Sequence, residues 1–186
     1  MTWDVVRNAG YILECDNLSD GPGMRKSREF LQRVARAFAR SCTSYYDSTG
    51  EVAFAHRERQ IHSVLLPSVS NVANAALMEQ PVVRRVRRES RHGWVDYWAQ
   101  YGSAVFLIEV KHAYCSAVSN RVRSVTQRAW SEALEQLRRI QASDFRHPVG
   151  SRQNVVRMAL LVVPTYQGSK YRETLETFNK EDAEQI

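Results

Sequence analysis

The sequence predicts a protein that combines α-helices and β-strands within one domain. Apolar residues recur at helical spacing in two long segments, 24–41 and 119–142, and shorter segments rich in β-branched and aromatic residues lie between and after them. From residue 51 onward the predicted order is helix, strand, strand, strand, helix, strand. A chain of 186 residues is long enough for one well-buried core, whereas two independent domains would each be small for stable folding. We therefore expect residues 1–186 to form a single domain.

The composition narrows the class of protein. No stretch approaches the roughly 18 apolar residues that a membrane span needs, and Met1–Gly10 lacks the apolar run of a secretory signal. We therefore expect a soluble, cytoplasmic protein with no membrane partner. The three cysteines lie far apart and form no CxxC pair, so neither a disulfide framework nor a zinc site is expected. The formal net charge of +6 is compatible with a polyanionic partner.

The first predicted helix runs from about Met24 to Ser41. Three apolar residues at four-residue spacing form its core-facing side: Phe30, Val34 and Phe38. The arginines on its other faces are either a solvated surface or a phosphate-binding stripe. Asp47–Gly50 then reads as a turn.

A second helix is predicted over about Glu51–Leu66. It carries Glu58 on the side that faces the core, and Pro67 is expected to limit it. The segment Ser68–Glu79 is of low polarity and predicts a further helix that ends near Pro81.

Val82–Arg88 has the composition of a strand and contains four arginines, Arg84, Arg85, Arg87 and Arg88. A basic strand edge either contacts phosphates or discourages aggregation, and both alternatives stay open. Later in the chain, a long helix is predicted from about Ser119 to Ala142 and an apolar strand over Val155–Val163. The remaining tail, residues 164–186, is mostly polar and charged.

A tight hairpin is predicted from two neighbouring strands, Trp94–Gln100 and Ala104–Lys111. If Gly102-Ser103 is a two-residue loop with glycine at the first central position of a type II′ turn, Tyr101 faces Ala104. Partner residues then have numbers that sum to 205, so Asp96 lies opposite Glu109.

This register brings two carboxylates and one amine together. Directly opposed like charges destabilise a sheet, and a carboxylate at the end of a buried strand is costly unless it is paired, protonated or bound to metal. Lys111 points to the same side as Glu109 because side chains alternate along a strand. Two carboxylates suit a hard ion such as Mg²⁺, with Lys111 orienting the attacking water or stabilising charge on a phosphate. The alternative is a structural ion cluster of Asp96, Lys111 and Glu109.

The spacing of Asp96 and Glu109-Val110-Lys111 resembles the motif of the PD-(D/E)xK nuclease superfamily, an acid on one core strand followed by acid-any-lysine on the next. Val95 stands where the superfamily often has proline, and Gly93-x-x-Asp96 matches a frequent local variant. The resemblance covers about residues 51–163. It leaves the expected N-terminal helical extension, 1–50, and the C-terminal tail, 164–186, unassigned.

The resemblance implies an α/β fold with a restriction-endonuclease-like core, in which helices flank a central mixed four-stranded sheet. It implies hydrolysis of phosphodiester bonds with Mg²⁺ or Mn²⁺, within restriction, phage defence or a mobile element. DNA is favoured as the substrate because most members of the superfamily cut DNA, and RNA stays open as the alternative. The residues that it assigns to the metal are Asp96, Glu109, the Val110 carbonyl and Glu58. Gln136 matches a glutamine that follows the lysine strand in several branches.

We also expect nucleic-acid contacts from the four arginines of Val82–Arg88 and from His112, which lies beside Lys111 in sequence. A homodimer is expected if both strands of a duplex are cut, and the resemblance also allows a larger defence or repair complex. The alternative function is a catalytically inactive module of the same fold that binds nucleic acid or a protein partner.

Overall fold

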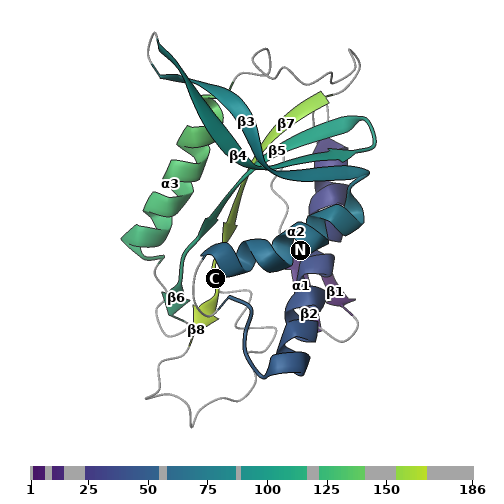
Figure 1. Cartoon of the computed structure of the whole chain (residues 1–186). Helices are drawn as coiled ribbons and strands as arrows, with labels where there is room; N and C mark the ends of the chain where they lie inside the picture. The colour runs from purple at the N-terminus through teal and green to yellow at the C-terminus, as the bar shows by residue number, and fades with distance from the viewer. Residues whose placement is uncertain are drawn as a thin grey trace.

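A four-stranded mixed sheet forms the centre of the molecule (Figure 1). The structure is a computed structural model and describes residues 2–6, 10–14, 24–54, 58–86, 89–116, 122–140 and 154–166. Neighbouring strands follow the order β3 (Ala75–Val86), β4 (Glu89–Tyr101), β5 (Ala104–His112) and β7 (Asn154–Val162). β4 is antiparallel to β3 and β5, whereas β7 is parallel to β5. The α/β class and the mixed four-stranded sheet are thus confirmed.

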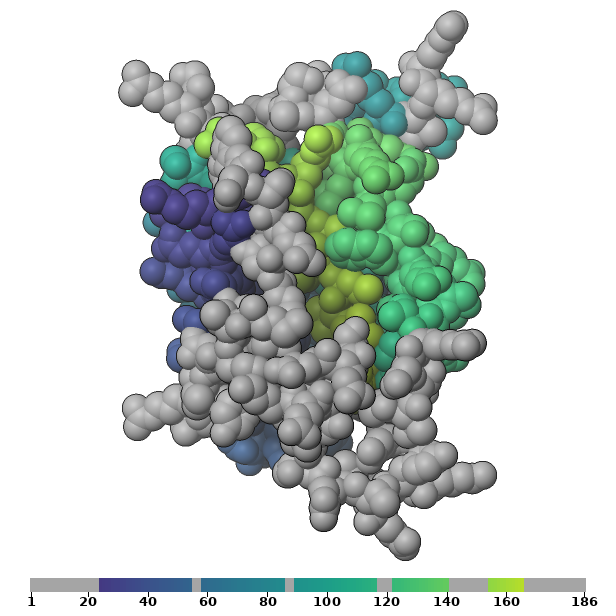
Figure 2. All heavy atoms as spheres, turned by 180° about the vertical axis from the view of Figure 1, so that it is seen from behind, coloured from purple at the N-terminus to yellow at the C-terminus, as the bar shows by residue number. Residues whose placement is uncertain are grey.

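Helices lie on both sides of this sheet. Figure 1 shows α3 (Ser124–Arg138) on one side, and α1 (Met24–Thr49) and α2 (Glu58–Val72) on the other. From behind, the edge strand β7 is visible between α1 and α3 (Figure 2). The order α2, β3, β4, β5, α3, β7 is the order predicted for the core.

Four short strands lie outside the central sheet. β1 (Thr2–Val6) and β2 (Gly10–Glu14) form an antiparallel pair, so the N-terminal extension contains a hairpin as well as the expected helix. β6 (Cys115–Ser116) pairs in parallel with β8 (Thr165–Tyr166). In the described segments, no helix combines the length and the apolar content that crossing a membrane requires.

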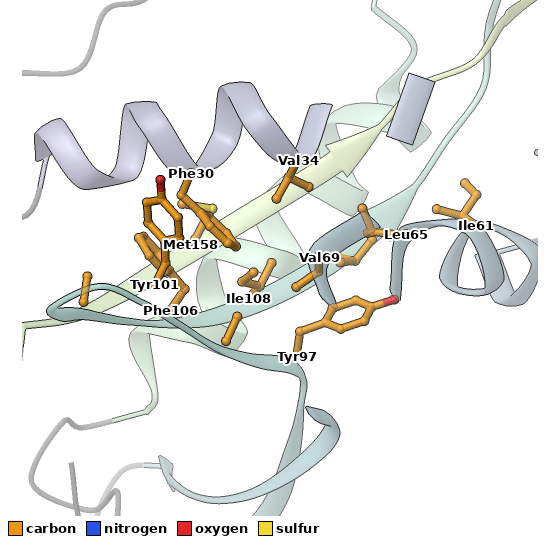
Figure 3. Packing of buried hydrophobic residues seen from close by; sticks show 13 residues of the cluster. Phe30, Val34, Ile61, Leu65, Val69, Tyr97, Tyr101, Phe106, Ile108 and Met158 are labelled. Carbon is orange, nitrogen blue, oxygen red and sulfur yellow. The ribbon is translucent and has the colours of Figure 1, made fainter. Parts of the chain in front are cut away.

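Two apolar clusters pack against opposite faces of the sheet. The larger cluster joins α1 and α2 to β4 and β5, and within it the Phe30 ring stacks on Phe106 with centroids 4.4 Å apart (Figure 3). The second cluster packs Leu137 and Ile140 against Leu107 on the side of α3. Alternation along β5 therefore directs Glu109 and Lys111, which follow Leu107 at steps of two, toward the side of α3.

The hairpin between β4 and β5 has the predicted register. Tyr101 pairs with Ala104 and Tyr97 with Ile108, so the numbers of paired residues sum to 205 as expected. Gly102 has φ = 57°, the left-handed conformation that the first central position of a type II′ turn requires. The loop and the register are confirmed.

The helix predicted over Ser68–Glu79 is wrong for most of its length. α2 continues through Pro67 to Val72, and Ala75–Val86 is then a strand that pairs with β4. Pairing with β4 overrides the helix propensity of the alanines in this segment. Pro81 is tolerated because β3 is an edge strand, where a missing N–H costs no ladder hydrogen bond.

The ends of α1 and α2 also differ from the expectation. Most of the predicted turn at Asp47–Gly50 is instead the last part of α1, which ends at Thr49, and the hydroxyls of Ser48 and Thr49 donate to main-chain carbonyls four residues earlier. Gly50, at φ = 72°, ends the helix by donating its N–H to the Tyr46 carbonyl. α2 begins at Glu58, later than predicted.

Candidate active site where strands β4 and β5 part

Strands β4 and β5 part at the residue that the motif singles out. The regular pairing of β4 with β5 extends no further than Tyr97 and Ile108. One position beyond, Asp96 Oδ2 accepts a hydrogen bond of 2.7 Å from the Val110 N–H. The aspartate side chain therefore takes the role of a main-chain acceptor, which fixes its carboxylate against the end of β5.

The pairing of β3 with β4 is also interrupted at Asp96. Register partners run continuously on both sides, but the pair formed by Glu79 and Asp96 is missing. Glu79 has φ = 50°, a conformation that residues with a Cβ rarely adopt. The distortion of β3 thus coincides with the point at which β4 leaves β5.

Glu109 is buried at this divergence, with only 2% of its surface exposed. Its Oε1 lies 3.4 Å from Lys111 Nζ, and its Oε2 lies 3.2 Å from Arg84 Nη2. Burial raises the pKa of Glu109, and the negative charge of Asp96 raises it further, against the opposing effects of Lys111 and Arg84. Asp96 and Glu109 are thus close enough to repel each other, although the regular pairing ends one position before the predicted pair of Asp96 with Glu109.

The side chain of Arg84, on β3, crosses β4 to reach Glu109 on β5. A Cβ on Gly93 would lie 3.0 Å from Arg84 Cδ, so the arginine stem passes over a position that only glycine leaves open. Its guanidinium also donates to the Trp94 carbonyl and, over 3.3 Å, to Gln136 Oε1. Within the described residues, Arg84 Nε is buried and has no hydrogen-bond partner.

The end of α3 is attached to the strand that carries Arg84. The Arg85 N–H donates to the Arg139 carbonyl over 2.9 Å, and Ile140 forms an isolated bridge with Arg84. This attachment holds Gln136 beside the guanidinium. Gln136 therefore joins the group around Glu109 through Arg84.

Glu58 contacts a histidine one turn later on α2. Glu58 Oε1 lies 3.9 Å from His62 Nε2, and His62 Nδ1 shares a hydrogen bond of 2.6 Å with the Tyr97 hydroxyl. Glu58 is thus linked through His62 to Tyr97, the residue that follows Asp96.

His112 extends from β5 toward the side of α1 and α2. Its ring packs edge-on against Tyr114, and its buried Nε2 has no hydrogen-bond partner in the described part of the chain. Burial lowers the pKa of His112, and the negative charge of Glu58 opposes that shift. His112 is therefore close enough to Glu58 to be affected by its charge, although His112 is adjacent to Lys111 in the sequence.

The basic strand is only partly described. Arg84 is half-buried against Glu109, whereas Arg85 is exposed on the same strand. Arg87 and Arg88, also predicted to contact nucleic acid, lie outside the described residues.

The donors at this divergence have the chemistry that Mg²⁺ prefers, since Asp96 and Glu109 are carboxylates and the Val110 carbonyl is a third oxygen. Their present pairing leaves little room for the ion, because both oxygens of Glu109 contact cations. Among the residues that the structure describes, no three side chains of histidine, cysteine, aspartate or glutamate form a group that would hold a metal. The oxygen donors are thus of the type that Mg²⁺ binds. Either Arg84 or Lys111 has to move away from Glu109 before the metal ion can bind.

The sequence-based reasoning missed one ion pair of this site. The ion pair between Arg84 and Glu109 joins strands that are not neighbours in the sheet. The one signal for it was Gly93, because a glycine inside a strand often marks a close approach of another group.

Comparison of the chain with protein-family models, with curated proteins and with solved structures found no match.

Proposed function

We propose that the protein is a metal-dependent nuclease with a restriction-endonuclease-like core, and that Asp96, Glu109 and Lys111 form its active site. The observation that carries the proposal is the burial of Glu109 between Lys111 and the charge of Asp96 at the point where two strands part. Such a concentration of charge is costly in a core and is typical of functional sites.

Each residue has a distinct role in this proposal. Asp96 and Glu109 would hold a Mg²⁺ or Mn²⁺ ion, with the Val110 carbonyl as a further oxygen donor. When bound, the ion supplies Lewis-acid activation of water and of the phosphate. Lys111 orients the attacking water and stabilises negative charge on the scissile phosphate.

The resemblance also implies a role for Glu58, as a ligand of a second metal or of a metal-bound water. The Glu58 carboxylate lies 3.9 Å from His62 Nε2, on the side of α2.

The proposed substrate is nucleic acid, with DNA favoured over RNA by the resemblance to PD-(D/E)xK nucleases. The net charge of +6 and the exposed Arg85 favour a polyanionic substrate. The biological setting that we propose is restriction, phage defence or a mobile element. A homodimer would account for cleavage of both strands of a duplex.

Cleavage of plasmid and single-stranded DNA in Mg²⁺, in Mn²⁺ and in EDTA tests the proposal. We expect metal-dependent cleavage that falls at least about 100-fold in Asp96→Asn, Glu109→Gln and Lys111→Met, because each variant removes a group required in the transition state. The matched control is Glu135→Gln, which removes an exposed acid of α3 that pairs with Arg139. Its cleavage rate should equal that of the unmodified protein.

The alternative function is a module of this fold that binds nucleic acid or a protein without cleaving it. The observation that favours it is the ion pair of Arg84 with Glu109, because two cations already neutralise the buried acid. Absence of cleavage in every substrate and metal, with folded protein and retained binding of DNA, would establish this alternative and exclude the nuclease.

A further inference from the structure

Arg84 is held at Glu109 by contacts from three elements. Its guanidinium contacts the Glu109 carboxylate on β5, the Trp94 carbonyl on β4 and the Gln136 amide oxygen on α3. Its stem passes over Gly93, where a methyl group would crowd it. The surrounding groups therefore hold one cation beside Glu109. This explains the position of Arg84 on β3, which has no part in the catalytic roles proposed above.

The charges at the candidate active site identify which cation has to leave. Asp96, Glu109, Lys111 and Arg84 together carry a net charge of zero when all are ionised. A divalent ion and a phosphodiester would add one positive charge between them. Loss of Arg84 from the group restores neutrality, and the half-buried site is then balanced with both metal and substrate present.

Arg84 is also the cation that geometry favours for exchange. Lys111 lies two residues from Glu109 on the same face of the same strand, so its ammonium reaches the carboxylate without crossing another strand. The Arg84 side chain instead crosses β4 from β3 to reach Glu109, so a shift of its stem withdraws the guanidinium from the carboxylate. Gln136 and the Trp94 carbonyl offer it partners that do not depend on Glu109.

We propose that Arg84 is a displaceable counter-cation that neutralises Glu109 in the metal-free protein, and that a divalent ion binds by taking Glu109 Oε2 from the guanidinium. Arg84 is then a positioning residue that sets the metal affinity of the site, and Gln136 is the group that holds it nearby. This inference rests on the proposed function, since it assumes that Asp96 and Glu109 are metal ligands.

Direct Mn²⁺ binding to the full chain, measured without DNA by electron paramagnetic resonance, tests the inference. Arg84→Gln should bind Mn²⁺ at least about tenfold more tightly than the unmodified protein, because the ion no longer competes with a charged group for the carboxylate. The control is Arg91→Gln, which also removes one positive charge. Arg91 is the cross-strand partner of Arg84 on β4, and its guanidinium pairs with the exposed Glu89. Its affinity should change by less than about threefold, since exposed charges are screened.

Two further measurements keep the test decisive. The gain in affinity should disappear when Arg84→Gln is combined with Glu109→Gln, because the carboxylate is then replaced by a neutral amide that binds the ion weakly. If Arg84→Gln unfolds in EDTA, Mn²⁺ should restore its circular dichroism spectrum at concentrations that leave the unmodified protein unchanged. Equal Mn²⁺ affinity in Arg84→Gln and Arg91→Gln, or no recovery of an unfolded variant, would overturn the inference.

The failure of this inference is distinguishable from failure of the proposed function. DNA cleavage with no difference in Mn²⁺ affinity between the two arginine variants keeps the nuclease and removes the role of Arg84. Tighter Mn²⁺ binding in Arg84→Gln without cleavage of any DNA keeps the role of Arg84 and removes the nuclease.

Discussion

Gly93 is the residue whose missing side chain admits Arg84 to the candidate active site. An added methyl group would lie 3.0 Å from Arg84 Cδ and 3.1 Å from its Nε, tighter than an ordinary van der Waals contact. A free surface arginine would move aside. Arg84 has contacts on three elements, so a shift at its stem weakens hydrogen bonds at its head.

We therefore predict that Gly93→Ala lowers the free energy of unfolding by roughly 1 kcal/mol in the unmodified protein. In an Arg84→Ala background the same change should be neutral or stabilising by about 0.5 kcal/mol, because alanine restricts the unfolded chain more than glycine does. Urea denaturation of the four proteins in this double-mutant cycle measures the coupling. Equal effects of Gly93→Ala in both backgrounds would show that the two residues do not interact.

At the scale of elements, Phe30 joins α1 to the sheet. It is 1% exposed, stacks on Phe106 and lies near the Tyr101 ring, so one aromatic residue connects the helix to both strands of the hairpin (Figure 3). We predict that Phe30→Ala lowers the free energy of unfolding by about 3–5 kcal/mol, through lost burial and the cavity that remains. Phe30→Leu should cost less because it leaves a smaller void.

Thermal and urea denaturation measure these changes, and Tyr46→Ala is the matched control. Tyr46 is also an aromatic residue of α1, but 53% of its surface is exposed. Its loss should change stability by less than about 0.5 kcal/mol. If Phe30→Ala is equally mild, α1 contributes little to holding the sheet.

The local elements that the sequence predicted well are those with their own short-range signals. Gly102 defined the hairpin loop, and the register followed by counting from it. The four-residue spacing of Phe30 and Val34 identified the side of α1 that faces the core, where both residues are buried. These features depend on neighbours in sequence, so a single chain is sufficient to recognise them.

The features that sequence reasoning missed depend on contacts between distant segments. Ala75–Glu79 has helix-forming residues, yet it is a strand because β4 provides partners for it. Similarly, nothing near Arg84 in sequence indicates that it spans β4 to reach Glu109 on β5. The sequence therefore predicted that Lys111 lies beside Glu109, but not that Arg84 is a second cation at the same carboxylate.

At the scale of the whole molecule, the excess positive charge bears on the proposed binding of nucleic acid. A net charge of +6 would favour the proposed association with DNA through release of counterions, and such binding weakens with salt in proportion to the number of phosphates contacted. Arg85 is the exposed arginine of the basic strand whose side chain the structure describes beside Arg84. It is therefore the residue at which a phosphate contact is tested most directly.

We predict that Arg85→Gln weakens DNA binding about equally for all sequences. The plot of log affinity against log salt concentration has a negative slope, and its magnitude should fall by about 1. Fluorescence anisotropy with a labelled duplex measures this slope, in a Lys111→Met background that prevents cleavage. Arg128→Gln, which removes an exposed arginine from α3, is the control and should leave the slope unchanged. Equal slopes in all three proteins would place the DNA away from β3, and equal losses in both arginine variants would mean that net charge alone, rather than a contact at Arg85, governs binding.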